Sequence, residues 1–254
     1  MITVAATMAE ILEAGHVYFF YRPRVEQERA SGLRDVQRLY MVLHPRGKRA
    51  WRLIVIPRKR LPEVGSHERE WAFVDTVGRS PEEVEDALDR QQYETKTRGE
   101  RVRPEARPAG EGVYVLARHG DHTHLAYELE LPKRPGEVQR ELRIQKKASY
   151  IVAVKNPDAP SPAGVGLPED ERPALPKRLK QKFRDHRFAE ADPELLDRTG
   201  TELVLIGAAE EPERELGIDL RARDERGTQA AIFRDLKLER DQHPLEPLFR
   251  GEWQ

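Results

Sequence analysis

The chain has 254 residues, and its 44 lysines and arginines nearly balance its 45 aspartates and glutamates, for a net charge of −1. The overall charge therefore does not attract nucleic acid or an acidic partner, so binding of either would have to depend on local clusters of basic residues. The absence of cysteine excludes disulfides, thiol catalysis and cysteine-ligated metals, and it is compatible with a cytoplasmic location. Because no apolar run approaches the roughly 20 residues of a membrane span, we expect no membrane association.

The first part of the chain predicts a helix followed by an antiparallel meander. Residues 9–14 have apolar positions at helical spacing before Gly15, which predicts a short helix, so residues 1–7 are compatible with an extension ahead of a start at Met8. Aromatic and β-branched runs then predict strands at residues 16–25, 35–43, 50–57 and 71–77. Ser80, Pro81 and Glu83 have the spacing of a capping box and predict a helix to about residue 91.

Residues 112–132 form the most strongly patterned segment. Two apolar runs, 113–117 and 125–131, flank Gly120-Asp121, a pair that favours a two-residue hairpin loop. In this register His119 lies opposite His122, and Ala117 lies opposite His124, so the three histidines share one face. The other face is predicted to face the core and carries Tyr114, Leu116, Leu125, Tyr127 and Leu129.

This clustering makes His119, His122 and His124 candidate ligands for zinc or another divalent transition metal. Neutral imidazoles around such an ion, with water in an open position, would generate a nucleophile near neutral pH. Two alternatives remain open from the sequence. The face can be a solvated polar surface, or the histidines can serve acid–base chemistry or pH sensing without metal.

The remaining segments are shorter and less regular. Residues 94–111 are polar and contain prolines and glycines, which predicts a connecting loop, a flap or an irregular edge strand around 95–102. Leu248, Phe249 and Trp253 are expected to pack back on the body of the protein. The other expected elements are a helix at 135–144, a strand at 149–155, a proline-rich loop at 157–176, a helix from 176 to about 184, a short helix after Asp192-Pro193, a strand at 201–206 and a helix at 230–238.

Together these elements predict an α+β protein. We expect a mainly antiparallel sheet of about seven or eight strands, built from a meander plus a hairpin, with helices packed on one face. A single domain over residues 1–254 is the simplest organisation. A subdivision into 8–93 and 112–254, connected by 94–111, is the alternative.

The second candidate site is a basic strand pair. Eight lysines and arginines and no acid lie between Arg38 and Arg60, with Trp51 among them. Such a ribbon can grip the phosphates of nucleic acid or another polyanion, and a second basic run at 177–187 could extend the footprint. The alternative is a solvated edge paired with glutamates, with Trp51 in the core. The predicted polyanion-binding residues are Arg46, Lys48, Arg49, Arg52, Arg58, Lys59 and Arg60.

The sequence supports three functional hypotheses from different classes. The first is a non-enzymatic binding or regulatory module that uses the basic ribbon or the proline-rich loop. The second is a metal-dependent hydrolase built on the three histidines, and the third is a structural or interaction protein. The sequence alone leaves open whether the chain is an enzyme, and it does not determine the oligomeric state.

Overall fold

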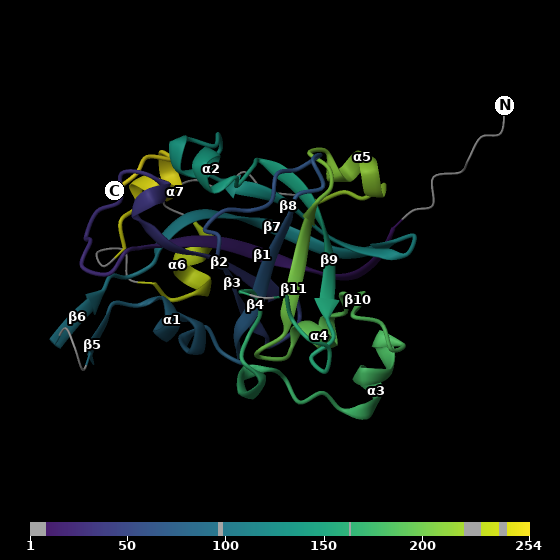
Figure 1. Cartoon of the computed structure of the whole chain (residues 1–254). Helices are drawn as coiled ribbons and strands as arrows, with labels where there is room; N and C mark the ends of the chain where they lie inside the picture. The colour runs from purple at the N-terminus through teal and green to yellow at the C-terminus, as the bar shows by residue number, and fades with distance from the viewer. Residues whose placement is uncertain (1–8, 96–98, 163, 221–229, 239–242) are drawn as a thin grey trace.

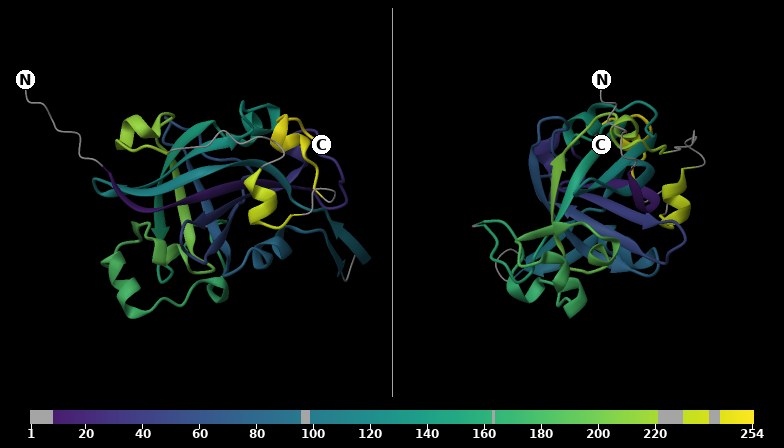
Figure 2. Two further views of the ribbon diagram at one scale, coloured as in Figure 1. Left: turned by 180° about the vertical axis from the view of Figure 1, so that it is seen from behind. Right: turned by 90° about the vertical axis from the view of Figure 1, so that its right-hand side faces the viewer.

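A closed antiparallel barrel forms the body of the protein. The computed structural model describes residues 9–95, 99–162, 164–220, 230–238 and 243–254, so the expectation for residues 1–7 lies outside the described residues. Within these ranges the strands pair in the order β10-β9-β11-β4-β3-β2-β1-β7-β8, and β9 also pairs with β8, which closes eight of them into a barrel (Figure 1, Figure 2). The barrel strands are β1 (Glu10–Pro23), β2 (Val36–Pro45), β3 (Trp51–Ile56), β4 (Arg69–Gly78), β7 (Arg107–His119), β8 (His122–Leu131), β9 (Lys147–Lys155) and β11 (Glu202–Gly207).

The closed barrel corrects the predicted architecture. Strands and antiparallel pairing were expected, but the α+β arrangement with helices on one face is wrong, because the sheet closes on itself and short helices surround it. Closure depends on β11, which pairs with β4 on one side and β9 on the other, two strands far apart in the sequence. The helices are α1 (Glu82–Leu88), α2 (Glu137–Leu142), α3 (Lys177–Lys180), α4 (Pro193–Leu196), α5 (Pro212–Leu216), α6 (Ala231–Asp235) and α7 (Glu246–Phe249).

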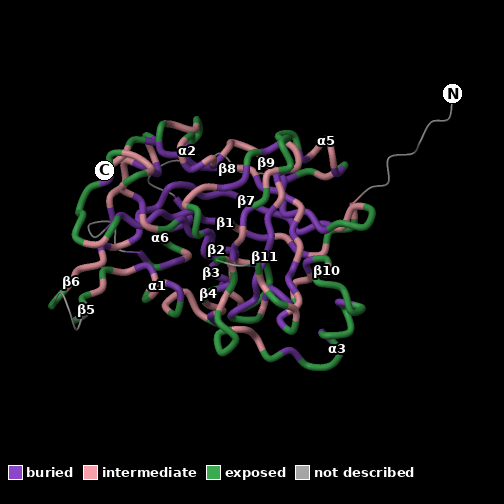
Figure 3. Tube along the Cα trace, in the orientation of Figure 1, coloured by how far each residue is buried: buried purple, intermediate pink, exposed green. Residues whose placement is uncertain are grey.

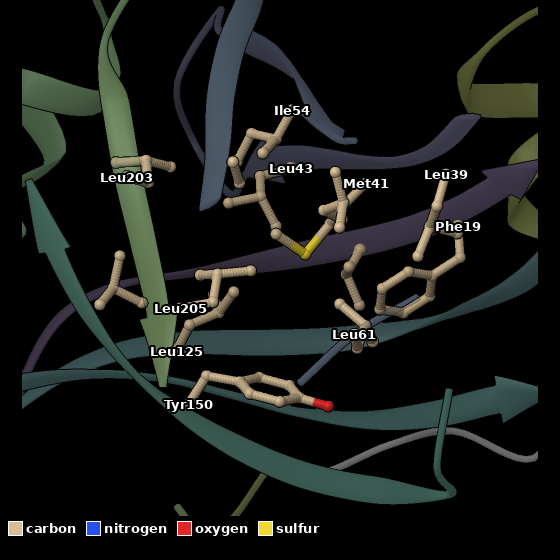
Figure 4. Packing of buried hydrophobic residues seen from close by; sticks show 14 of the residues in the cluster. Phe19, Leu39, Met41, Leu43, Ile54, Leu61, Leu125, Tyr150, Leu203 and Leu205 are labelled. Carbon is tan, nitrogen blue, oxygen red and sulfur yellow. The ribbon is translucent and has the colours of Figure 1, made fainter. Parts of the chain in front are cut away.

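Side-chain alternation along the strands fills the barrel interior. In β1, Val17, Phe19 and Tyr21 belong to the interior cluster, whereas Tyr18 and Phe20 belong to a second cluster outside the barrel wall. This is the two-residue period of a strand buried on both faces. Interior side chains from β2, β3, β8, β9 and β11 belong to one buried cluster, so the barrel holds a packed core (Figure 4).

Short helices close the two ends of the barrel. At the end that we call the α2 end, Val138 and Leu142 of α2 join the interior cluster together with Leu61. At the opposite α4 end, Leu179 of α3 and Leu195 of α4 do the same. The β2–β3 turn lies at the α4 end. The residues after β3 lie at the α2 end, where Leu61 N donates a hydrogen bond to Leu142 O of α2.

Helices α1, α5, α6 and α7 contribute buried residues to the clusters on the outer wall. Buried residues of α6 pack on the outward residues of β1, β2 and β3, and Glu111 of β7 accepts hydrogen bonds from Ala231 N (3.1 Å) and Ile232 N (2.8 Å) at the start of that helix. Leu216 of α5 packs on the outward side of β7 and β8. Burial is therefore nearly continuous along the barrel strands, while exposed residues gather in the turns and in the α3 segment (Figure 3).

Several local predictions need revision. Residues 9–14 were predicted as a helix, but residues 10–14 belong to β1, because pairing with β7 outweighs the weak helical tendency of so short a segment. Residues 94–111 contain β6 (Gly99–Arg103), which pairs with β5 (Gln91–Thr95), and the start of β7. The barrel takes strands from both 8–93 and 112–254.

The proline-rich loop is anchored to the barrel wall by a buried ion pair. Lys155 Nζ of β9 and Glu202 Oε2 of β11 lie 3.0 Å apart and are almost fully buried. Glu202 also accepts a hydrogen bond from Leu167 N (2.9 Å), and Lys155 donates to Ala159 O (2.7 Å), so both charges are satisfied by the loop that covers them. β10 (Phe188–Glu190) then pairs with the end of β9.

None of the helices in the described ranges has the length and apolar character needed to cross a bilayer.

Candidate functional site

Four arginines from distant parts of the chain surround one open cleft at the α4 end of the barrel. Arg49 comes from the β2–β3 turn, Arg79 follows β4, Arg178 lies in α3, and Arg198 lies between α4 and β11. The cleft has a volume of about 610 Å³, and all four side chains are exposed. We call it the arginine cleft. It brings the tip of the predicted basic ribbon together with the second basic run.

Three of these arginines have no acidic partner. Within the described ranges, Arg49, Arg79 and Arg198 form no ion pair, whereas Arg178 Nη1 pairs with Glu194. An arginine without a protein partner keeps its planar fork of donors available for a carboxylate or a phosphate. The cleft therefore presents uncompensated positive charge on a protein whose net charge is close to zero.

The two acids that line the cleft are each paired with an arginine. Glu194 is held by Arg178, and the hydrogen bond and charge of that guanidinium lower the pKa of the Glu194 carboxyl. Asp197 Oδ1 accepts a hydrogen bond of 2.7 Å from Nε of Arg52, which is fully buried behind the cleft. Because both carboxylates have cationic partners, they do little to repel an anion that enters.

Arg52 belongs to a buried polar network inside the barrel mouth. Its guanidinium forms a two-pronged contact with Glu13, through Nη1 to Oε1 and through Nη2 to Oε2 at 2.9 Å. Glu13 also accepts from Tyr114 OH (2.7 Å) and from Lys48 Nζ (3.0 Å). Glu13 accepts four hydrogen bonds, and Arg52 donates to two carboxylates. Both buried charges are therefore compensated by hydrogen-bonded partners.

The network fixes the protonation of its members. Burial alone would raise the pKa of Glu13, but the hydrogen bonds and charge of Arg52, with the Tyr114 and Lys48 contacts, bring that pKa below its usual value. Burial alone would lower the pKa of Arg52, but Glu13, with smaller contributions from Tyr114 and Asp197, raises it. Burial and the neighbouring Glu13 carboxylate raise the pKa of Tyr114. Glu13 therefore stays ionised and holds Arg52, which in turn holds Asp197 at the cleft wall.

The structure divides the predicted basic set between the two barrel ends. Arg46, Lys48 and Arg49 lie at the tip of the β2–β3 turn, and Arg49 lines the arginine cleft. Arg52 points into the barrel and takes no part in a solvent-facing surface. Trp51 is buried on the outer wall, where it stacks on His44 with ring centroids 3.7 Å apart.

The remaining three predicted residues lie beyond the other end of β3. Arg58 pairs with Glu70 and Arg60 with Glu68, and Lys59 is half-buried. The six-residue β3 separates the two groups by roughly 20 Å. One ligand-binding surface therefore does not contain all seven residues.

The histidine hairpin has the predicted register. His119 pairs with His122 and Ala117 with His124. The predicted core face is confirmed, because Tyr114, Leu116, Leu125, Tyr127 and Leu129 all belong to the interior cluster. In the described ranges, however, no group of three or more histidines and acids is arranged to hold a metal ion. The three-histidine metal site stays a prediction without support from this geometry.

His124 is more buried than the other two histidines, of which His119 is half-buried and His122 is exposed. His124 is buried beside α5, with its ring centroid 6.1 Å from that of His119 and its Nδ1 3.9 Å from Glu215 Oε2. That glutamate instead accepts a hydrogen bond of 2.6 Å from Ser149 Oγ. Burial lowers the pKa of His124, Glu215 opposes this effect, and His119 and His122 add to it. These surroundings therefore favour the neutral form of His124.

Two cleft residues were missed from the sequence. Arg79 follows β4 and Arg198 precedes β11, and each is a single arginine in a mixed-charge context. Neither position carries a local signal. They become neighbours of Arg49 because β3 pairs with β4 and β4 pairs with β11.

Comparison with known proteins adds no relative. No protein-family model matches the chain, and comparisons with curated proteins and with solved structures give no significant match.

Proposed function

We propose that this protein is a non-enzymatic binding module that holds a phosphate-bearing polyanion in the arginine cleft. One observation carries the proposal. Arg49, Arg79 and Arg198 come from three separate segments, surround one cleft, and have no ion-pair partner in the described part of the chain. Nucleic acid is the leading candidate among such polyanions.

Arginine suits this role better than a general positive surface would. Its guanidinium donates two parallel hydrogen bonds to a phosphate and remains charged at every physiological pH. Three such groups around a cleft of about 610 Å³ can contact neighbouring phosphates of one flexible chain. Binding of this kind is mostly electrostatic, so we expect micromolar affinity at best and strong salt dependence.

The lining of the cleft favours binding over catalysis. Its two carboxylates, Glu194 and Asp197, are engaged by Arg178 and Arg52 and are poorly placed to act as a general base. The other polar side chain that lines it is Thr199. The metal-dependent hydrolase that the three histidines suggested is the weaker alternative, since these residues lack a metal-binding arrangement in the described ranges.

The test is the affinity for a short, fluorescently labelled single-stranded oligonucleotide, measured by anisotropy at low salt. The wild-type protein is compared with an Arg49→Ala, Arg198→Ala double variant. Each lost charge-assisted contact weakens binding by roughly tenfold, so the double variant is expected to lose at least that much affinity.

A matched control removes the same charge from the other end of the barrel. Arg34 and Arg38 are exposed and lie just before and within the start of β2. The Arg34→Ala, Arg38→Ala variant should bind like the wild type. Absence of binding at low salt, or an equal loss in both double variants, would reject the arginine cleft as the binding site.

A further inference from the structure

A second cleft adjoins the arginine cleft and shares Arg178 with it. This cleft has a volume of about 870 Å³ and lies between the tip of the β7–β8 hairpin, the α3 segment and β10. It forms because β8 leaves the edge of β9 at Ile151, and β10 takes over that edge from Ala153 onward. The two strands diverge there, and the space between them stays open.

The floor of the second cleft is apolar. Ile151 and Ala153 of β9 and Ile206 of β11 line it from the outer wall of the barrel and are only partly buried. Phe188 of β10 stands beside them with 36% of its surface exposed. In the described ranges only one other large hydrophobic residue, Ile11, is exposed. An aromatic ring is therefore presented to solvent within a concave site.

Four lysines and arginines line the second cleft, and two of its three acids are paired with two of them. Glu190 accepts a hydrogen bond of 3.1 Å from Arg118, and Asp192 accepts one of 2.8 Å from Lys182. The third acid, Asp121, is exposed at the hairpin tip, 3.5 Å from Nε2 of His122. Arg184 also lines the cleft and forms no ion pair within the described ranges. An anionic ligand thus meets Arg184 on the wall and apolar surface beneath.

Phe188 has the neighbours of a stacking site. The guanidinium of Arg187 lies over its ring at 5.9 Å, and the ring of Trp71 lies 6.3 Å away. Aromatic rings combined with arginine planes are the surfaces on which single-stranded nucleic acids stack their bases. Bases of a duplex are already stacked and paired, and inorganic polyphosphate has no ring to place there.

We propose that the two clefts form one track for single-stranded nucleic acid, with phosphates at the arginine cleft and a base against Phe188. This proposal rests on the proposed function and narrows the ligand from phosphate-bearing polyanions in general to single-stranded nucleic acid. Arg178 lies at the junction of the two clefts, where the backbone of the bound strand passes from one to the other.

The test compares three ligands of equal length: an oligonucleotide, the same sugar–phosphate backbone without bases, and inorganic polyphosphate. The wild-type protein should bind the oligonucleotide about tenfold more tightly than the abasic strand, as one stacked base predicts. A Phe188→Leu variant should lose this preference and keep the abasic affinity. Phe188→Trp should restore the preference, and Ile11→Ala, which alters the other exposed hydrophobic residue, should leave it unchanged.

The outcomes separate this inference from the proposed function. Equal affinity for the intact and abasic strands, or a preference that survives Phe188→Leu, would overturn the single-strand track while leaving polyanion binding in place. Failure of all three polymers to bind, or binding that does not depend on Arg49 and Arg198, would overturn both.

Discussion

Arg52 and Glu13 form a buried two-pronged ion pair inside the α4 end of the barrel, directly behind the arginine cleft. Strand alternation puts Arg52 there, because Trp51 and Leu53 face outward and Arg52 and Ile54 face inward. The pair therefore links the hydrophobic core to the cleft wall through Asp197.

The Arg52→Leu variant should be strongly destabilised. It leaves Glu13 buried without its main partner, and breaking a buried ion pair in this way costs roughly 3–5 kcal/mol of unfolding free energy. Removing both charges with Glu13→Leu, Arg52→Leu should recover part of the loss. Urea unfolding measures each value. Lys48→Ala, which removes a half-exposed partner of Glu13, should cost at most about 1 kcal/mol.

The buried His124 should make stability depend on pH. Its pKa is lowered in the folded state from an ordinary value of 6.5, so below that value the unfolded chain binds a proton that the folded chain does not. Stability should consequently fall as the pH falls below 6.5 towards the folded pKa. Unfolding free energies at about pH 7.5 and about pH 5.5 give the size of the loss. His124→Asn should reduce this loss, and His186→Asn, at an exposed position, should not.

The pairing of β7 with β8 includes a close backbone approach at Gly112. A Cβ atom at this position would lie 2.0 Å from Glu128 O on the neighbouring strand β8, where the β7–β8 register shifts. Gly112→Ala should therefore destabilise the protein by about 2 kcal/mol or more, because backbone atoms must move. Gly32→Ala is the control, since its Cβ would meet Glu141 Oε2 at 3.5 Å in extended backbone. A thermal unfolding midpoint for Gly112→Ala equal to that of the control would show that the wall yields there at little cost.

Local elements could be predicted from the sequence, but barrel closure could not. The 112–132 hairpin has the register that its apolar alternation and Gly120-Asp121 predict. Closure joins β11 to β4 and β9 to β8, and no single segment encodes which distant edges will meet. The alternation in the barrel wall also explains why α+β was the wrong class. Strands buried on both faces are as apolar as strands covered by helices.

The candidate site shows the same division. The basic ribbon and the second basic run were both visible in the sequence, and the structure places Arg49 and Arg178 on one cleft. Burial of Arg52 was not expected, because a charged residue in a run of basic residues is normally exposed, and its partner Glu13 lies in a segment predicted to be helical. Arg79 and Arg198 could be found only from the strand order.

The salt dependence of oligonucleotide binding tests the central claim most directly. For a single strand, the logarithm of the association constant falls with the logarithm of salt concentration by about 0.7 for each phosphate neutralised. If Arg49 and Arg198 each hold a phosphate, the slope for the Arg49→Ala, Arg198→Ala variant should be shallower than the wild-type slope by about 1.4. A slope and an affinity that stay at the wild-type values would contradict the account.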